Sequence, residues 1–561
     1  MEQLKEEFLH FWREKSFAAA LVLMTALSFA TQLMEPTIGI DDTSFKLYYV
    51  DGVSPAMGRW CTYLINKILP LKYNPHFVET VGVCIFALAV SLWCVVFYRV
   101  LGERLPFAGY IAFACAMVSS PILAEVEIWY LQDASHLGYF ATALSVLVAM
   151  NTLREEKLPR KDYWLQILLS GAFLTFALGC YEAFMLVFII GCLFLFFMIH
   201  VMKGEKDVKY TGKVSRWFGS GVAILAISMV LRTLVIKLVT VVFRLEDQRA
   251  VLETRDFGDI LKLTVGGEDG QKGLADLWFI VKDFFVKYYL HAICYVPIMI
   301  FVLAALVLGT AAVVYTIRRR DGWILLALIG VLLTPLALSF VEGHASYYRT
   351  AHYIPLVTAF AVLLLFWVLR KNRSRIVRYV GYACLFILLY RQGYEMNRWM
   401  YVDAMKYEDD KRVMNSVGLY IQENLDASLP ICVIGEYEND KSLLEDVYLQ
   451  DWSKKYTILE TLVNAIEPEI FEKYNTPYGY AAAETPQLSM IKWGATAFYG
   501  FDRELIAFWK MHGFTFREDG NLGHYSEARE LMRDGPVWPE KGSIVQTEDY
   551  IIVNFGYPDE N

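Results

Sequence analysis

Two adjacent carboxylates, Asp41 and Asp42, directly follow an apolar run that is long enough to cross a membrane. They are therefore expected at the boundary between lipid and water. Partial desolvation there raises the pKa of a carboxylate and makes it a better general base. The pair could instead belong to a solvated loop, an ion path or a metal site, although a metal site would need more oxygen ligands than this segment contains.

Three cations could hold a phosphate group. Arg59, in the short sequence GRW, could clamp a phosphate through parallel hydrogen bonds or could snorkel toward lipid headgroups. Arg232 and Lys237 lie inside the apolar stretch SMVLRTLVIKLVTVVFR. A cation as deep as Arg232 marks a functional site, or it pairs with a carboxylate such as Glu182. Lys237 lies nearer the end of the stretch and could reach a headgroup.

Two further segments combine aromatic rings with titratable groups: EVEIWYLQDASH at 125–136 and SFVEGHASYYRTAHYIP at 339–355. Aromatic faces can stack on sugar rings, while arginine and histidine can hold phosphate. Arg349 is the phosphate candidate in the second segment. With Glu182, the candidates for contact with a sugar or an acceptor are Trp129, Tyr130, Asp133, His136, His344, Tyr347, Tyr348 and His352.

The composition places these residues in a membrane protein. Of the 561 residues, 56% are hydrophobic and 20% are charged, whereas soluble domains have about 45–50% apolar and about 25% charged residues. The nine cysteines include no CxxC pair, which argues against a disulfide framework or a zinc site. No sustained basic face is present, so nucleic acid is not expected as a partner.

Hydropathy predicts about eleven transmembrane helices, because a hydrocarbon core of about 30 Å needs ~20 apolar residues per helix. The first is a signal anchor, since its apolar run is too long for a cleaved signal peptide. The predicted spans are 16–34, 77–98, 107–124, 134–151, 164–181, 183–202, 217–243, 290–317, 322–341, 351–369 and 376–392.

The connecting loops predict the orientation. Alternate loops are short and rich in lysine and arginine, and such loops face the cytoplasm. The N-terminus is then inside, and everything after residue 392 is outside. The remaining loops, also expected outside, are 35–76, 125–133, 244–289 and 342–350.

These observations predict a polytopic α-helical membrane protein with a C-terminal extracytoplasmic α/β domain. The membrane domain is expected over 1–392, and its outer-face segments are 35–76, 125–136, 244–289 and 342–352. The soluble domain is expected over 393–561, where PICVIGEY and YIIVNFG suggest strands between helix-like segments.

Four short motifs carry a resemblance to a known family. They are GIDDTSF, GRW, EGHASYYRTAHYIP, and the closing GSIVQTEDYIIVNFG. Together they resemble the type II O-antigen glucosyltransferase family, polytopic bacterial enzymes of GT-C architecture. The resemblance implies an inverting transferase at the outer face of the bacterial cytoplasmic membrane. Its donor would be a sugar on polyprenyl phosphate, such as undecaprenyl-phosphate glucose, and its acceptor a surface polysaccharide or a lipid-linked glycan.

The resemblance also implies that an acid of the first external loop is the catalytic base, here Asp41 or Asp42, with Asp41 favoured. The base would deprotonate the acceptor hydroxyl, and Asp133 or Glu182 is the second candidate for positioning the acceptor. Because the leaving group is a lipid phosphate, cations are needed where its charge develops. Those candidates are Arg59, Arg232, Lys237 and Arg349. No cofactor and no obligatory metal are expected, and the only other partners are membrane lipids.

Two other kinds of protein stay open from the sequence. A flippase for lipid-linked sugars, or a polysaccharide transporter, would carry polar residues through to the cytoplasmic side, whereas here they concentrate on the outer face. A noncatalytic envelope-assembly protein would keep its function when Asp41 is replaced by Asn. A GxxxxGKS phosphate loop is absent from the sequence, which argues against ATP-driven work within this chain.

Overall fold

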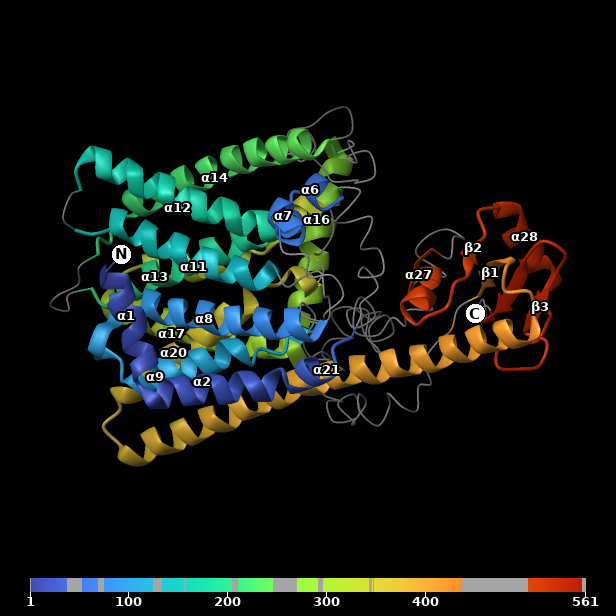
Figure 1. Cartoon of the computed structure of the whole chain (residues 1–561). Helices are drawn as coiled ribbons and strands as arrows, with labels where there is room; N and C mark the ends of the chain where they lie inside the picture. Colours follow the sequence, from blue (N-terminus) through green and yellow to red (C-terminus); the bar gives the residue numbers. More distant parts are fainter. Residues whose placement is uncertain are drawn as a thin grey trace.

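The structure is a computed structural model. It describes residues 2–37, 53–68, 75–124, 134–155, 158–203, 210–245, 270–290, 296–342, 346, 348–435, 437 and 503–556. Most of these residues form a bundle of helices, and the chain then leaves the bundle along one very long helix that ends at a small α/β unit (Figure 1).

The bundle contains long, mostly apolar helices. Its elements are α1 (Glu2–Arg13), α2 (Lys15–Ser28), α3 (Ala30–Met34), α6 (Val53–Ala56), α7 (Trp60–Ile68), α8 (Pro75–Leu101), η1 (Gly102–Arg104), α9 (Phe107–Val118), α11 (Ala134–Thr152), α12 (Arg160–Cys180), α13 (Phe184–Val201), α14 (Val214–Phe243), α16 (Gly270–Phe285), η4 (Val286–Leu290), α17 (Val296–Arg319), α18 (Trp323–Leu333), α19 (Leu336–Glu342), η6 (Tyr348–Thr350), α20 (Ile354–Arg370) and α21 (Arg375–Asn424).

Several of these helices can cross a membrane. Within the described ranges, five stretches are long and apolar enough to do so: His76–Arg104, Arg160–Cys180, Phe184–Val201, Val214–Phe243 and Met299–Arg319. Shorter apolar helices are α2, α9, α18 and α20. The chain is therefore a polytopic, mostly helical membrane protein. The predicted first span is divided into α2 and α3 at Phe29.

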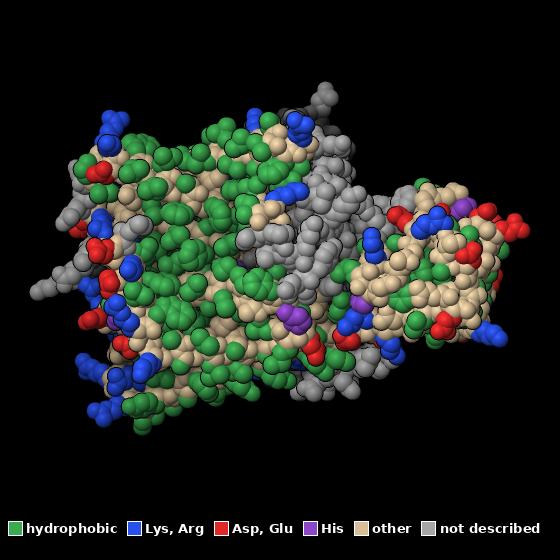
Figure 2. All heavy atoms as spheres, viewed as in Figure 1, with side chains coloured by type: hydrophobic (Ala, Val, Ile, Leu, Met, Phe, Trp, Pro, Cys, Tyr) green, Lys and Arg blue, Asp and Glu red, His purple; other side chains and the backbone are tan. Residues whose placement is uncertain are grey.

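Apolar side chains cover the visible flank of the bundle, while lysine and arginine gather at the end that carries the N-terminus (Figure 2). Hydrogen bonds and ion pairs join different helices and loops at this basic end. Arg99 Nε donates to Glu7 at 2.7 Å, and Arg216 donates to the Arg154 carbonyl at 2.8 Å. The carboxylate of Asp321 contacts the His200 ring at 2.8 Å.

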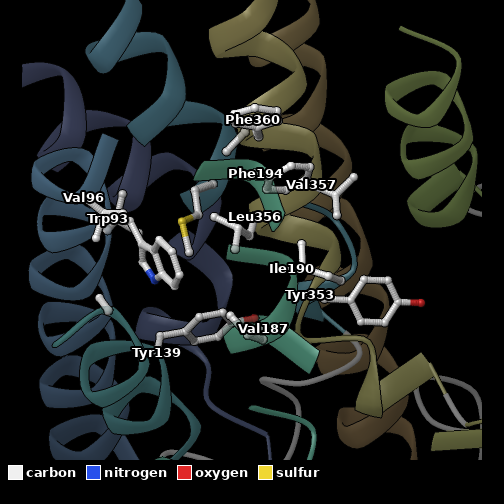
Figure 3. Close-up of a cluster of buried hydrophobic side chains, with 14 of the residues drawn as sticks. Trp93, Val96, Tyr139, Val187, Ile190, Phe194, Tyr353, Leu356, Val357 and Phe360 are labelled. Carbon is white, nitrogen blue, oxygen red and sulfur yellow. The ribbon is translucent and has the colours of Figure 1, made fainter. Parts of the chain in front are cut away.

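The bundle core is packed by large side chains from α8, α11, α13 and α20 (Figure 3). The rings of Phe194 and Phe360 stack with centroids 3.9 Å apart, while Trp93 and Tyr139 lie on the other side of the cluster from Tyr353. Because lipid is as apolar as these side chains, close van der Waals packing holds such helices together. This packing determines how each helix is rotated, and so which residues meet at the bundle ends.

The helix α21 is 50 residues long, or about 75 Å at 1.5 Å per residue. Its first part packs on α2, α3 and α20, and it runs without a break through the predicted domain boundary at 392/393. At its far end, the carbonyl of Met414 accepts a hydrogen bond from Trp509 Nε1 at 2.7 Å. One helix therefore joins the bundle to the C-terminal unit.

The C-terminal unit has a four-stranded sheet in the order β2-β1-β4-β3. Its elements are β1 (Pro430–Ile434), α27 (Arg503–Met511), β2 (Arg517–Glu518), α28 (Leu522–Leu531), β3 (Ile544–Gln546) and β4 (Ile551–Asn554). Strand β1 is parallel to β2 and β4, and β3 is antiparallel to β4. Side chains of β1 alternate between two apolar clusters, as expected for a strand covered on both faces: Ile431 packs in one and Cys432 in the other.

Candidate active site

The end of the bundle opposite the basic end carries a glutamate in a tight connection between two spans. Helix α12 ends at Cys180 because Tyr181 is extended, with φ −158° and ψ 137°, and α13 begins at Phe184. Glu182 therefore lies at a helix end rather than inside a span. Its Oε1 accepts a hydrogen bond from Arg59 Nη2 at 3.2 Å, and both side chains are partly buried.

Arg59 reaches Glu182 from the connection between α6 and α7. Its backbone N–H donates to the Ser54 carbonyl at 2.8 Å, and that of Gly58 donates to the Pro55 carbonyl at 2.9 Å. The Arg59 guanidinium lies 4.2 Å from the centroid of the Tyr181 ring. An aromatic face and a carboxylate therefore hold the same guanidinium, which limits its rotation.

Arg232 joins this cluster from the middle of α14. Its Nη2 lies 3.4 Å from the Met57 carbonyl, and its Nε has no hydrogen-bond partner among the residues that the structure describes. Gly58 makes this approach possible, because a Cβ at that position would lie 1.8 Å from Arg232 Nη2. Gly58 also has φ +88°, a conformation that side-chain-bearing residues seldom adopt.

The cluster of Arg59, Glu182 and Arg232 has one more positive than negative charge. Burial raises the pKa of the Glu182 carboxyl, but Arg59, by its charge and hydrogen bond, and Arg232, by its charge, outweigh this. The pKa of Glu182 therefore lies below its ordinary value, and the carboxylate stays ionised at neutral pH. An excess guanidinium charge near the end of the membrane spans suits a phosphate group.

Trp60 follows Arg59 and packs directly against α12, so we expect Gly179→Ala to destabilise the protein. A Cβ at Gly179 would lie 2.3 Å from Trp60 Cε2, and forcing atoms into packed contacts costs about 1–3 kcal/mol. Shifting Trp60 also moves Arg59. The measurement is the melting temperature in detergent, which should fall.

Gly219→Ala is the matched control, because a Cβ at Gly219 in α14 meets nothing within 4 Å. Alanine in place of glycine within a helix stabilises it by about 0.5–1 kcal/mol. The control should therefore melt at the same temperature or higher. Equal melting temperatures for the two variants would show that the contact between Gly179 and Trp60 does not matter.

His352 lies beside the cluster, between η6 and α20. It is fully buried, and its ring centroid is 4.9 Å from that of Tyr181 and 5.0 Å from that of Phe184. Burial lowers its pKa to about 3, and the nearby Glu182 offsets this only in part. The ring is therefore neutral, and it can offer one donor and one acceptor to a sugar hydroxyl. A positively charged side chain that holds a phosphate could not offer both. Neither ring nitrogen has a hydrogen-bond partner among the described residues.

The other candidates that the structure describes are His136, Tyr348, Arg349 and Lys237. His136 is buried against Phe86, with ring centroids 5.3 Å apart. Tyr348 is buried, and its hydroxyl donates to the Lys287 carbonyl at 2.8 Å. Arg349 is partly buried in η6. Lys237 is exposed, and five residues of helix rotate it about 140° away from Arg232.

The other candidates lie outside the described residues. They are Asp41, Asp42, Trp129, Tyr130, Asp133, His344 and Tyr347. Their roles remain predictions.

Two buried residues at this end of the bundle are not among the candidates from the sequence. Tyr181 carries the aromatic face under Arg59, and its only signal was its place beside Glu182. Glu79 is 1% exposed near the start of α8, on the helix face that also carries Phe86 seven residues later. An acid inside an apolar run, in HFVETVG, was the signal for Glu79. Within the described part of the chain, no three histidine, cysteine or acidic side chains group as metal ligands do.

The fold and the site define a polytopic membrane protein with a cationic cluster at one end of its helices. The chain belongs to the Glucosyl transferase GtrII family, whose model matches residues 30–366. It is therefore a glycosyltransferase, and the family implies glucosyl transfer in glycan assembly. The match contains every candidate from Asp41 to His352 and ends within α20, so α21 and the C-terminal unit lie beyond it. No curated protein and no solved structure matched the chain.

Proposed function

We propose that this glucosyltransferase moves a hexose, preferably glucose, from polyprenyl phosphate to a bacterial surface polysaccharide or a lipid-linked glycan. Transfer takes place at the outer face of the cytoplasmic membrane and inverts the anomeric centre. The observation that carries the proposal is the cluster of Arg59, Glu182 and Arg232. It has an excess positive charge at the end of the bundle where a lipid phosphate would lie.

The proposed topology has about eleven transmembrane helices, the N-terminus inside and the residues after 392 outside. Five long and four shorter apolar helices support this number, with α11 and the start of α21 as the other two. The basic residues at the N-terminal end support a cytoplasmic location for that end (Figure 2). The cluster of Arg59, Glu182 and Arg232 then faces outward.

The proposed chemistry begins with a proton transfer from the acceptor hydroxyl to Asp41 or Asp42. The acceptor oxygen attacks the anomeric carbon while the bond from that carbon to the phosphate oxygen breaks. The donor phosphodiester carries one negative charge, and the departing polyprenyl phosphate carries two. Guanidinium groups at this position stabilise the transition state more than the bound donor, and this difference is what accelerates a reaction.

The direct test is transfer of radiolabelled glucose from undecaprenyl-phosphate glucose by the purified full chain in proteoliposomes. A glycan acceptor prepared from the source envelope should gain label, and the lipid should lose it. Movement of the intact lipid-sugar between leaflets without transfer would identify a flippase. Neither transfer nor movement, with loss of envelope glycan in cells lacking the protein, would identify a noncatalytic assembly protein.

We expect transfer to continue in excess EDTA at half the untreated rate or more. The leaving group is a lipid phosphate whose developing charge Arg59 and Arg232 can stabilise, so a divalent cation is not required for that step. Initial rates with and without EDTA measure this directly. A loss of tenfold or more that Mg²⁺ or Mn²⁺ restores would contradict the expectation.

A further inference from the structure

A cavity of about 340 Å³ opens between α13, α14 and α18, and Arg59, Glu182 and Arg232 are not among its lining residues. Its walls include Phe188 and Phe196 of α13, Trp217 and Gly221 of α14, and Leu326 of α18. We call it the basic-end groove, because its lining along α14 starts at Val214, the first residue of that helix.

The basic-end groove is about one membrane leaflet deep. Its lining along α14 ends at Leu225, eleven residues or about 16 Å from Val214. Half of a hydrocarbon core of about 30 Å is ~15 Å. The groove therefore has the depth of a lipid tail that enters from the basic end.

The walls of the basic-end groove fit hydrocarbon rather than a polar ligand. Ser220 carries the one hydroxyl among the described lining residues. This hydroxyl is already hydrogen-bonded to the hydroxyls of Thr152 at 3.3 Å and Tyr163 at 2.9 Å. The indole N–H of Trp217 donates to the Thr211 carbonyl at 2.7 Å. The Ser220 hydroxyl and the Trp217 indole N–H are therefore already engaged within the protein.

The mouth of the groove is cationic. Lys213, next to Val214, is exposed, whereas Arg216 is partly buried and donates to the Arg154 carbonyl at 2.8 Å. Lys203 is 66% exposed, and its Nζ lies 3.0 Å from Asp321 Oδ2, so this lysine is partly neutralised. Basic residues at this depth attract anionic headgroups.

We propose that the basic-end groove binds one anionic phospholipid of the leaflet at that end. One acyl chain fills the groove, and the phosphate lies against Lys213. An apolar slot one leaflet deep, directly under exposed cations, matches both parts of such a molecule. The site is separate from the proposed transfer reaction, and its existence does not depend on that reaction.

The test is native mass spectrometry of the delipidated full chain with added phosphatidylglycerol or phosphatidylcholine of identical tails. We expect phosphatidylglycerol adducts to survive at several times the level of phosphatidylcholine adducts. Gly221→Leu should reduce them at least fivefold, because a Cβ at Gly221 meets nothing within 4 Å and the larger side chain can enter the groove. Gly219→Leu is the matched control, since Gly219 is equally unobstructed but does not line the groove.

Lys213→Gln tests the headgroup contact on an exposed residue, so the result does not depend on filling a packed space. It should bring phosphatidylglycerol down toward the level of phosphatidylcholine. Equal retention of the two lipids by the wild type, or equal loss from the Gly221 and Gly219 variants, would overturn the proposal. So would displacement of phosphatidylglycerol by equimolar undecaprenyl phosphate, which would assign the groove to a polyprenyl lipid.

Discussion

Replacing Asp41 by Asn, Asp42 by Asn, or both, is expected to slow sugar transfer by about 10²–10⁴-fold in at least one single variant and in the double variant. A positioned general base contributes a factor of this size, and asparagine keeps the shape of aspartate while losing its basicity. The single variants will show which of the two acts as the base. The measurement is the initial rate of transfer in proteoliposomes that contain equal amounts of inserted protein.

Asp534→Asn is the matched control, because Asp534 is an exposed acid of the C-terminal unit. It should leave the transfer rate unchanged. Wild-type transfer by both single variants and by the double variant would show that neither aspartate is the base. The acid would then have to be sought elsewhere, and Glu79 and Glu182 are two described acids at the end of the bundle opposite the basic end.

Replacing Arg232 by Met is expected to lower kcat by about 10²–10³-fold, the range found when one group that stabilises a developing negative charge is removed. KM for the donor should rise less, because the phosphate has one negative charge when bound and gains the second as the bond breaks. Arg59→Gln should also lower kcat more than it raises KM for the donor. Initial rates over a range of donor concentrations separate kcat from KM.

Failed insertion cannot explain such a loss, because Arg232→Met makes α14 more apolar and membrane insertion more favourable. Arg373→Gln removes one charge from an exposed position at the basic end and should leave both kinetic constants unchanged. A kcat for Arg232→Met within threefold of the wild type would exclude Arg232 from charge stabilisation. The contact of Arg232 with Met57 would then be structural only.

The sequence by itself determined the class of protein and pointed to three charged residues that the structure brings together, Arg59, Glu182 and Arg232. Runs of about twenty apolar residues indicate spans because the hydrocarbon core has a fixed thickness. Arg232 stood out for a related reason, since a cation far from both ends of a span is costly unless it has a partner. The sequence offers Glu182 as a partner for Arg232, and the structure brings Arg232 and Glu182 into one cluster. The family resemblance, carried by short motifs, agrees with the match over residues 30–366.

Only the tertiary structure decided which groups meet. Arg59 and Glu182 are 123 positions apart, and their contact depends on how α7, α12 and α14 are rotated against one another. Hydropathy reports the length of a helix but not this rotation, because it sums over a window without regard to direction. The rotation follows from local fits such as Gly179 against Trp60 and Gly58 against Arg232, which a single sequence does not display.

The same reason explains the basic-end groove and the charge of His352. A groove forms where three helices separate slightly, and a histidine becomes neutral when rings from other helices bury it. Both depend on atoms that come from distant parts of the chain. The sequence determines which side chains are available and how deep in the membrane they lie, while packing between helices determines which of them share a site.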